Sequence, residues 1–209
     1  MGKINVLLKF LEKRYGYPEF SRNKFKLLIT TVLSQRTRDE NTYRASKNLF
    51  SVVNGPEDIL KLPLKNLKEL IKPSGMYRQK AERIKKICKI LVKEYGGKVP
   101  NTREELMKLP GVGYKTADIV LSYGFGVPTI AVDTHVNRIP KRIGIVRKDA
   151  TVEEVRKTME KYVKGRKRFL VNIGLVRFGQ EICRPVRPKC EICPINKICD
   201  YYKSLYNKK

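Results

Sequence analysis

The chain has 209 residues, 41% of them hydrophobic, which is enough to bury one large core or two small ones. Lys and Arg outnumber Asp and Glu by 46 to 20, giving a formal net charge of +26, and this excess is spread along the chain. Such a charge is typical of a folded surface that binds a polyanion, so we expect nucleic acid as the partner. No apolar run approaches the roughly 18 residues of a membrane span, and the N-terminus lacks a signal-peptide pattern. We therefore expect no membrane association and a cytoplasmic protein, nucleoid-associated if it is prokaryotic.

Apolar residues recur at helical spacing along most of the chain, so we predict an all-α fold. Glycine and proline mark the ends of most of these segments. The expected helices cover residues 4–15, 23–34, 39–53, 57–61, 64–71 and 77–95, then a pair on either side of a turn at 109–113, then a helix from about 134, then 151–162 and 169–178. Only residues 127–132 resemble a strand.

Several side chains mark helix starts within this pattern. Asp39 is the expected N-cap of its helix, because a short acceptor side chain can bind the free amides of the first turn. Two pairs, Thr102 with Glu105 and Thr151 with Glu154, have the spacing of capping boxes. The sequence therefore predicts well-defined starts for three helices.

The stretch Leu-Pro-Gly-Val-Gly at 109–113 connects two helical segments. Gly111 and Gly113 permit positive φ and the close approach of another backbone. The amides of Gly113, Tyr114 and Lys115 are the expected free donors at the start of the second helix, where they suit a phosphate oxygen. The five residues alone are equally compatible with a plain turn. The flanking helices and the basic composition favour a helix-hairpin-helix motif that binds DNA.

Lys115 lies in the first turn of the second helix, where the helix dipole disfavours a cation. It is either a phosphate-binding lysine or a nucleophile whose neutral amine is favoured by that position. Asp133 follows the apolar residues 129–132 and precedes a helix, so it is an expected N-cap that can also serve chemistry. We interpret His135, the only histidine, as a structural hydrogen-bonding residue rather than a catalyst.

Four of the five cysteines, Cys183, Cys190, Cys193 and Cys199, lie close together near the C-terminus. A disulfide framework would spread its cysteines to join distant loops, whereas four neighbouring thiolates can surround one metal centre. The Cys-x2-Cys pair suits zinc as well as iron. The fifth, Cys88, lies on the apolar stripe of residues 77–95 and is expected to be an ordinary core thiol.

The segment between the first two clustered cysteines is stiffened by prolines and carries three cations, Arg184, Arg187 and Lys189. A metal centre would hold this loop at both ends. We therefore expect a preorganised clamp for DNA phosphates.

Taken together, these motifs resemble endonuclease III, a family in the helix-hairpin-helix DNA glycosylase superfamily. The resemblance covers about residues 25–201 and rests on LPGVGYKTA at 109–117, PTIAVDTH at 128–135 and the cysteine spacing. It implies two helical domains, a six-helix domain at 22–130 with the hairpin and a second domain at 1–21 plus 131–209. The second domain would carry a [4Fe-4S] cluster bound by the four clustered cysteines. We expect a monomer.

The resemblance also implies an activity, the removal of oxidised pyrimidines from double-stranded DNA that contains damaged bases or abasic sites. The family's catalytic lysine falls on Lys115 and its aspartate on Asp133. The damaged nucleotide would be flipped out of the duplex, Lys115 would attack the sugar, and Asp133 would take part in proton transfer and stabilise positive charge. β-Elimination from the resulting Schiff base would then cut the strand.

Three further DNA contacts follow from the family positions. Met76 matches an apolar residue that intercalates where the base has left, although it also suits a buried turn. In residues 33–39, LSQRTRD, Arg36 occupies the position of a glutamine that fills the space opposite the lesion, and Gln35 stands one residue earlier. This departure leaves the preferred lesion and opposite base open.

Two other functions compete with this one. A mismatch glycosylase for thymine or uracil opposite guanine, or for adenine, commonly lacks the lysine, so Lys115 argues against it. A non-catalytic helix-hairpin-helix module with a zinc-like knuckle would need neither Lys115 nor Asp133.

Overall fold

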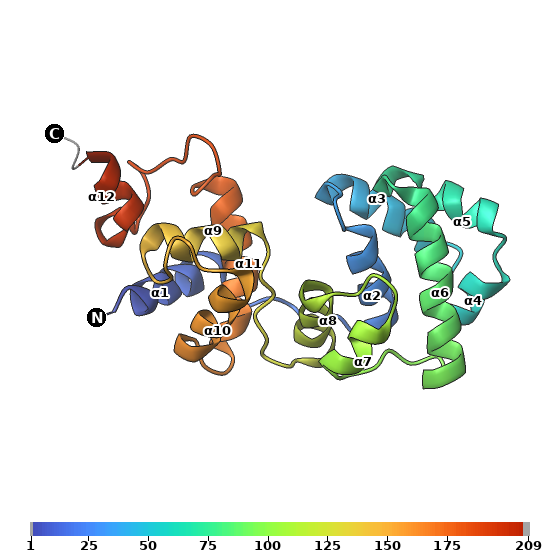
Figure 1. Cartoon of the computed structure of the whole chain (residues 1–209). Coiled ribbons are helices and arrows are strands. Elements are labelled where there is room, and N and C mark those ends of the chain that lie inside the picture. The colour runs from blue at the N-terminus through green and yellow to red at the C-terminus, as the bar shows by residue number, and fades with distance from the viewer. Residues whose placement is uncertain (1, 207–209) are drawn as a thin grey trace. The chain divides into compact units, whose positions relative to one another are not determined.

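The computed structural model describes residues 2–206 and has the all-α architecture that the hydrophobic spacing predicts (Figure 1). No strand occurs among these residues. In residues 127–132, the one strand-like segment, the Asn172 side chain bonds the Thr129 carbonyl and the Ala131 amide instead of a neighbouring strand. None of the described helices combines the length and apolar composition that a membrane span requires.

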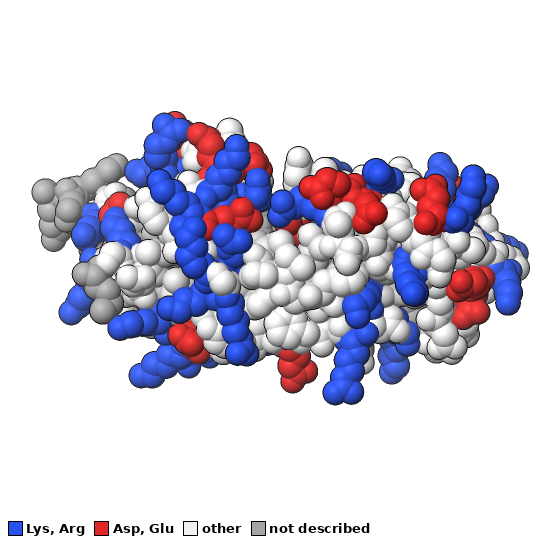
Figure 2. Space-filling model, turned by 90° about the horizontal axis from the view of Figure 1, so that it is seen from below, with Lys and Arg blue, Asp and Glu red and all other residues white. Residues whose placement is uncertain are grey.

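The chain divides into two compact units, which we call the hairpin unit (residues 20–126) and the cysteine unit (residues 1–19 and 127–209). Each has a hydrophobic core of its own. Lys and Arg side chains are spread over the surfaces of both units on the face shown in Figure 2. The positive charge therefore belongs to the folded units and not to a separate tail.

The hairpin unit is built around the long helix α6, whose buried stripe packs against α2, α4 and α5. Cys88 is fully buried on this stripe, and burial raises the pKa of its thiol to about 12. The prediction of a core thiol is thus confirmed. The elements of this unit are α2 (Lys24–Leu33), α3 (Asp39–Phe50), α4 (Pro56–Lys61), α5 (Leu64–Leu70), the 3-10 turn η1 (Lys72–Ser74), α6 (Tyr77–Tyr95), α7 (Arg103–Lys108) and α8 (Tyr114–Phe125).

The cysteine unit pairs the N-terminal helix with the helix that precedes the cysteines. Gly174 allows this close packing, because a Cβ there would lie 3.0 Å from the Leu11 side chain. The elements of this unit are α1 (Lys3–Tyr15), α9 (Thr134–Ile143), α10 (Val152–Tyr162), α11 (Lys167–Glu181), the 3-10 turn η2 (Asn196–Ile198) and α12 (Asp200–Tyr206). The sequence pattern missed α12, since 169–178 was the last helix expected.

The helix starts follow the predicted side chains in part. Thr151 and Glu154 form a full capping box at α10. At α7 the Thr102 hydroxyl accepts the Glu105 amide at 3.3 Å, but the Glu105 carboxylate accepts the Thr102 hydroxyl instead of its backbone amide. The prediction for Asp39 was wrong. It is the first residue of α3, one position inside the helix, where its charge still suits the positive end of the dipole.

Candidate functional site

The hairpin at 109–113 joins α7 to α8 and is anchored in the core of the hairpin unit. Val112 is only 5% exposed and belongs to the core of the hairpin unit, while Gly111 and Gly113 on either side are exposed. The two helices are tied by a partly buried ion pair, in which Arg103 donates to Asp118 Oδ1 at 2.7 and 2.9 Å. The hairpin is therefore a rigid projection with two glycines at its surface.

Gly111 is the point where the rest of the unit holds the hairpin backbone. Its φ is +72°, a left-handed conformation that favours glycine. The Gln35 side-chain amide donates to the Gly111 carbonyl at 2.9 Å and to the Thr116 hydroxyl at 3.2 Å. Arg83 of α6 in turn donates to the Gln35 side-chain oxygen at 2.9 Å. Arg83 packs so tightly that a Cβ on Gly111 would lie 2.4 Å from it.

The N-terminus of α8 faces outward. Its N-cap, Gly113, provides no side-chain hydrogen bond, so the first-turn amides keep their donors for another acceptor. Tyr114 and Lys115 are both exposed in this first turn. The arrangement suits an anion, and Lys115 lies in the same first turn.

In the cysteine unit, Asp133 caps α9 as predicted. Its Oδ1 accepts the backbone amides of His135 at 2.9 Å and Val136 at 2.8 Å. Its other oxygen, Oδ2, has no hydrogen-bond partner among residues 2–206. The side chain is half-buried, and one of its oxygens holds the start of the helix.

His135 packs inside the cysteine unit. Its Nδ1 lies 3.1 Å from the Arg138 guanidinium, and a Cβ on Gly179 of α11 would lie 2.1 Å from the same atom. Arg138 also donates to the Cys183 carbonyl at 2.9 Å. These contacts support a structural role for the ring.

Two residues predicted to contact DNA lie in separate loops of the hairpin unit, and both have left-handed backbone conformations. Arg36 is exposed with φ +53°, and Met76 is 50% exposed with φ +45°. Such values are strained for residues that carry a Cβ, and residues of this kind gather at functional sites. Met76 is not a buried turn methionine. Gln35 beside Arg36 faces the hairpin instead, so its part is to brace the motif.

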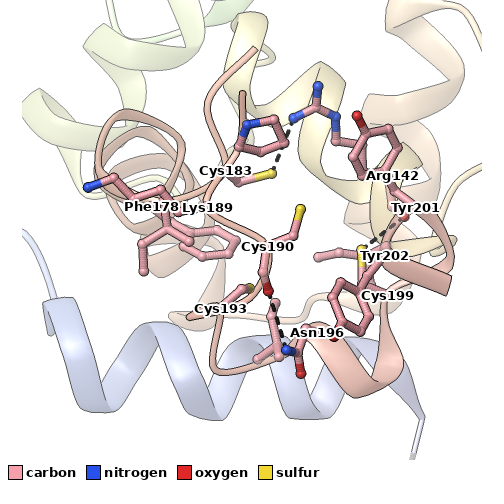
Figure 3. A pocket seen from close by; sticks show the side chains of 14 residues that line it. Arg142, Phe178, Cys183, Lys189, Cys190, Cys193, Asn196, Cys199, Tyr201 and Tyr202 are labelled. Atoms are coloured by element: carbon pink, nitrogen blue, oxygen red, sulfur yellow. Dashed lines mark hydrogen bonds between the residues drawn. The ribbon is translucent and has the colours of Figure 1, made fainter. Parts of the chain in front are cut away.

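The four clustered cysteines line one cavity of about 20 Å³ in the cysteine unit (Figure 3). All four are free thiols. Burial raises the pKa of Cys193 to about 11, as expected for a thiol in apolar surroundings, and a bound metal reverses this effect. The residues that the structure describes contain no group of three or more His, Cys, Asp or Glu side chains arranged to hold a single metal ion. In an iron–sulfur cluster, by contrast, each cysteine binds a different iron, so the thiols surround a cavity.

Arg142 of α9 organises one wall of this cavity. It donates to the Cys183 sulfur at 3.6 Å (Figure 3). It also donates to the carbonyls of Arg184 and Pro185 at 2.6 and 2.9 Å. Its guanidinium also stacks on Tyr201, 4.6 Å from the ring centre. The start of the segment after Cys183 is therefore fixed by α9.

Residues 184–189 form an exposed turn that we call the cationic loop. The amides of Arg184 and Lys189 both donate to the Ile182 carbonyl, at 2.9 and 3.0 Å, which closes the loop at its base. Arg187 has φ +49°, and it is the third and last non-glycine residue with positive φ in the part of the chain that the structure describes. All three predicted phosphate-binding cations are exposed.

The sequence analysis missed the residues that support these positions: Lys80, Arg83, Arg138 and Arg142. Lys80 leaves a signal, because it precedes Ile84 and Ile87 at the spacing of the buried stripe on α6. A lysine at an apolar position of a helix points to a buried polar function.

The two hairpin glycines provide a matched pair for stability. We expect Gly111→Ala to lower the free energy of unfolding by about 1–2 kcal/mol, because it strains a left-handed residue and displaces Arg83. Gly113 has φ −97°, and a Cβ added there would meet nothing within 4 Å. We therefore expect Gly113→Ala to change the free energy of unfolding by no more than about 0.5 kcal/mol. Urea unfolding of both variants measures the difference. Equal losses of unfolding free energy in the two variants would contradict the inference that Gln35 and Arg83 hold the Gly111 backbone in place.

Comparisons with known proteins agree with this geometry. The family model described as HhH-GPD superfamily base excision DNA repair protein matches residues 29–165. Endonuclease III of Thermotoga maritima is 49% identical over 96% of this chain and 93% of its own length, and that of Bacillus subtilis is 44% identical over 85% and 81%.

Solved structures give the same picture. A trapped endonuclease III–DNA covalent intermediate is 40% identical, with a TM-score of 0.90 over 98% of this chain and 99% of that one. A thermostable thymine-DNA glycosylase is 30% identical, with a TM-score of 0.87 over 96% and 95%. The chain belongs to the endonuclease III family of HhH-GPD base excision DNA repair proteins.

Proposed function

We propose that this enzyme, a DNA glycosylase and AP lyase, removes oxidised pyrimidines from duplex DNA, with Lys115 as nucleophile and Asp133 as its electrostatic partner. The observation that carries the proposal is that the N-terminus of α8 has no side-chain cap and exposes Lys115 in its first turn, where free backbone amides would suit a phosphate. The similarity to a covalent endonuclease III–DNA intermediate supports an amine nucleophile.

The chemistry follows from these groups. The flipped nucleotide is excised when the Lys115 amine bonds to C1′ and the glycosidic bond breaks, with the electron pair leaving on the base. In this proposal Asp133, whose Oδ2 is not used in capping α9, stabilises positive charge on the sugar and takes part in proton transfer. The bound amine loses a proton, and the sugar ring opens at the C1′–O4′ bond as O4′ takes up a proton, which turns the adduct into a protonated imine. The imine then acidifies C2′. Loss of a C2′ proton expels the 3′ phosphate and cuts the strand.

A trapping assay tests the two catalytic residues. Borohydride reduces the imine to a stable amine, so an abasic or thymine-glycol duplex should yield a covalent adduct with the wild type and none with Lys115→Ala. Lys108→Ala removes another exposed lysine of the same motif and should trap normally. Asp133→Asn keeps a good helix cap but loses the charge, so turnover should fall about 100-fold with DNA binding retained. A Lys115→Ala variant that still traps at the wild-type rate would refute the assignment.

We also propose that Cys183, Cys190, Cys193 and Cys199 hold a [4Fe-4S] cluster with a structural role. The residues present fit this group, because four free thiols line one cavity. When bound, the cluster would fix both ends of the cationic loop, leaving the catalytic steps to Lys115 and Asp133.

Iron analysis distinguishes this cluster from zinc. The anaerobically purified protein should be brown and contain iron and acid-labile sulfide in equal amounts. Alanine at any one of the four cysteines should reduce bound iron, whereas Cys88→Ala, which removes the fifth cysteine from the other unit, should not. A colourless protein with stoichiometric zinc would overturn the proposal.

The cationic loop is proposed to bind DNA phosphates through Arg184, Arg187 and Lys189. Glutamine at all three should reduce the slope of log affinity against log salt by about 2–3, since each lost phosphate contact removes about 0.9. Replacing Lys157, Lys161 and Lys164, three exposed lysines of the same unit, controls for net charge. Equal slopes in the two triple variants would remove the loop from the interface.

The similarity to a thymine-DNA glycosylase keeps mismatch repair as a second candidate. Arg36 bears on this choice, because an exposed guanidinium can donate to the acceptors of an unpaired opposite base. Excision from a thymine–guanine mismatch faster than from a thymine-glycol duplex would favour that candidate.

A further inference from the structure

A buried lysine with no part in the proposed chemistry lies beneath the two loops that carry Arg36 and Met76. Lys80 is in the first turn of α6 and is only 2% exposed. Its ammonium donates to the Leu33 carbonyl at 2.7 Å, the Thr37 hydroxyl at 2.7 Å and the Ser74 carbonyl at 2.8 Å. Three acceptors use all three of its protons.

These acceptors lie at the two loops. Leu33 ends α2 and directly precedes the first loop, residues 34–38, which contains Thr37 and in which Arg36 has left-handed backbone. Ser74 begins the second loop, residues 74–76, in which Met76 does. Thr37 joins the loops directly, because its hydroxyl also contacts the Ser74 carbonyl. Lys80 therefore cross-links two strained turns that are far apart in the sequence.

Stability alone does not explain a lysine at this position. Burying an ammonium group is costly, and an apolar side chain of similar volume often gives equal or greater stability. Burial and the neighbouring Arg83 lower the pKa of Lys80 to about 8, which reflects that cost. What an apolar side chain cannot supply is a donor to three oxygens at once. The lysine thus favours one conformation of the two loops over the others that they could adopt around an apolar side chain.

The same helix holds the other side of the first loop. Arg83, three residues after Lys80, binds Gln35, which in turn binds the Gly111 carbonyl of the hairpin. Residues 34–38 are thereby held between Lys80 and the DNA-binding motif. The positions of Arg36 and Met76 are fixed relative to the hairpin of the same unit.

We propose that Lys80 is a positioning residue that preorganises Arg36 and Met76 to fill the space left by an extruded nucleotide. The proposal rests on the proposed function, in which a base leaves the duplex. Without the lysine, the hairpin still binds phosphates, but the two loops lose the shared donor that holds their left-handed turns. Binding to undamaged DNA should persist, whereas the preference for a duplex in which a base is missing from the stack should be lost.

The test compares Lys80→Met with Lys85→Met. Both replace a lysine of α6 that donates to backbone carbonyls, but Lys85 binds those of Leu60 and Leu62, which belong to neither loop. The probes are an undamaged duplex and one with a tetrahydrofuran abasic analogue opposite 2-aminopurine. The chain has no tryptophan, so 2-aminopurine fluorescence reports displacement of the opposite base without interference.

We expect Lys80→Met to lose about tenfold in its preference for the abasic duplex over the undamaged one, and most of the fluorescence rise. Affinity for undamaged duplex should change less than twofold in either variant. Lys85→Met should keep both the preference and the fluorescence rise at a comparable loss of melting temperature. A Lys80→Met variant with wild-type preference and fluorescence would overturn the proposal.

Thr37→Val provides a milder variant if Lys80→Met does not fold. It removes the hydroxyl that Lys80 and Ser74 share and keeps the side-chain shape, so we expect a smaller loss of the same two signals; wild-type signals would count against the proposal. A wild-type protein that shows neither preference nor fluorescence rise would reject the proposed function, and this inference with it. Normal wild-type signals with an unaffected Lys80→Met would reject only the role of Lys80.

Discussion

The arrangement of the hairpin unit depends on hydrogen bonds that two cations of α6, Lys80 and Arg83, donate to side-chain and backbone oxygens of neighbouring segments. Arg83 reaches the hairpin through Gln35, and Lys80 reaches the two loops that carry Arg36 and Met76. These bonds lie beside Arg36, Met76 and Gly111, whose backbone has positive φ, and for Arg36 and Met76 this conformation costs energy unless its surroundings enforce it. The surface expected to meet DNA is therefore imposed by a rigid helix beneath it, as precise recognition requires.

The residues assigned to chemistry are likewise positioned by a small number of contacts. Val112 anchors the hairpin in the core, so the first turn of α8 projects its amides and Lys115 outward. Asp133 uses one carboxylate oxygen as a helix cap and leaves the other unused by the cap, so the proposed catalytic role is compatible with the structural one. In the cysteine unit, Arg142 holds the segment after Cys183, so that a metal centre and α9 together would shape the cationic loop.

Much of this was predictable because the signals are local. Hydrophobic spacing predicts the all-α fold, the PGVG turn predicts the hairpin between α7 and α8, and a short acid before a helix predicts the Asp133 cap. Asp39 failed by one residue, because several polar residues precede α3 and any of them could begin it. The short helix α12 follows a cysteine-rich segment without clear periodicity. The roles of Lys80, Arg83 and Gln35 depend on contacts between residues 40 to 80 positions apart, which spacing along one helix cannot show.

The central claim is that one amine, on Lys115, performs the chemistry in a chain with 46 lysines and arginines, many of them exposed. The most direct test is to digest the borohydride-reduced adduct of the unaltered protein and locate the modified residue by mass spectrometry. If Lys115 is the nucleophile, the sugar remnant will be found on Lys115 alone. A remnant on another lysine or on the terminal amine, with Lys115 unmodified, would contradict it.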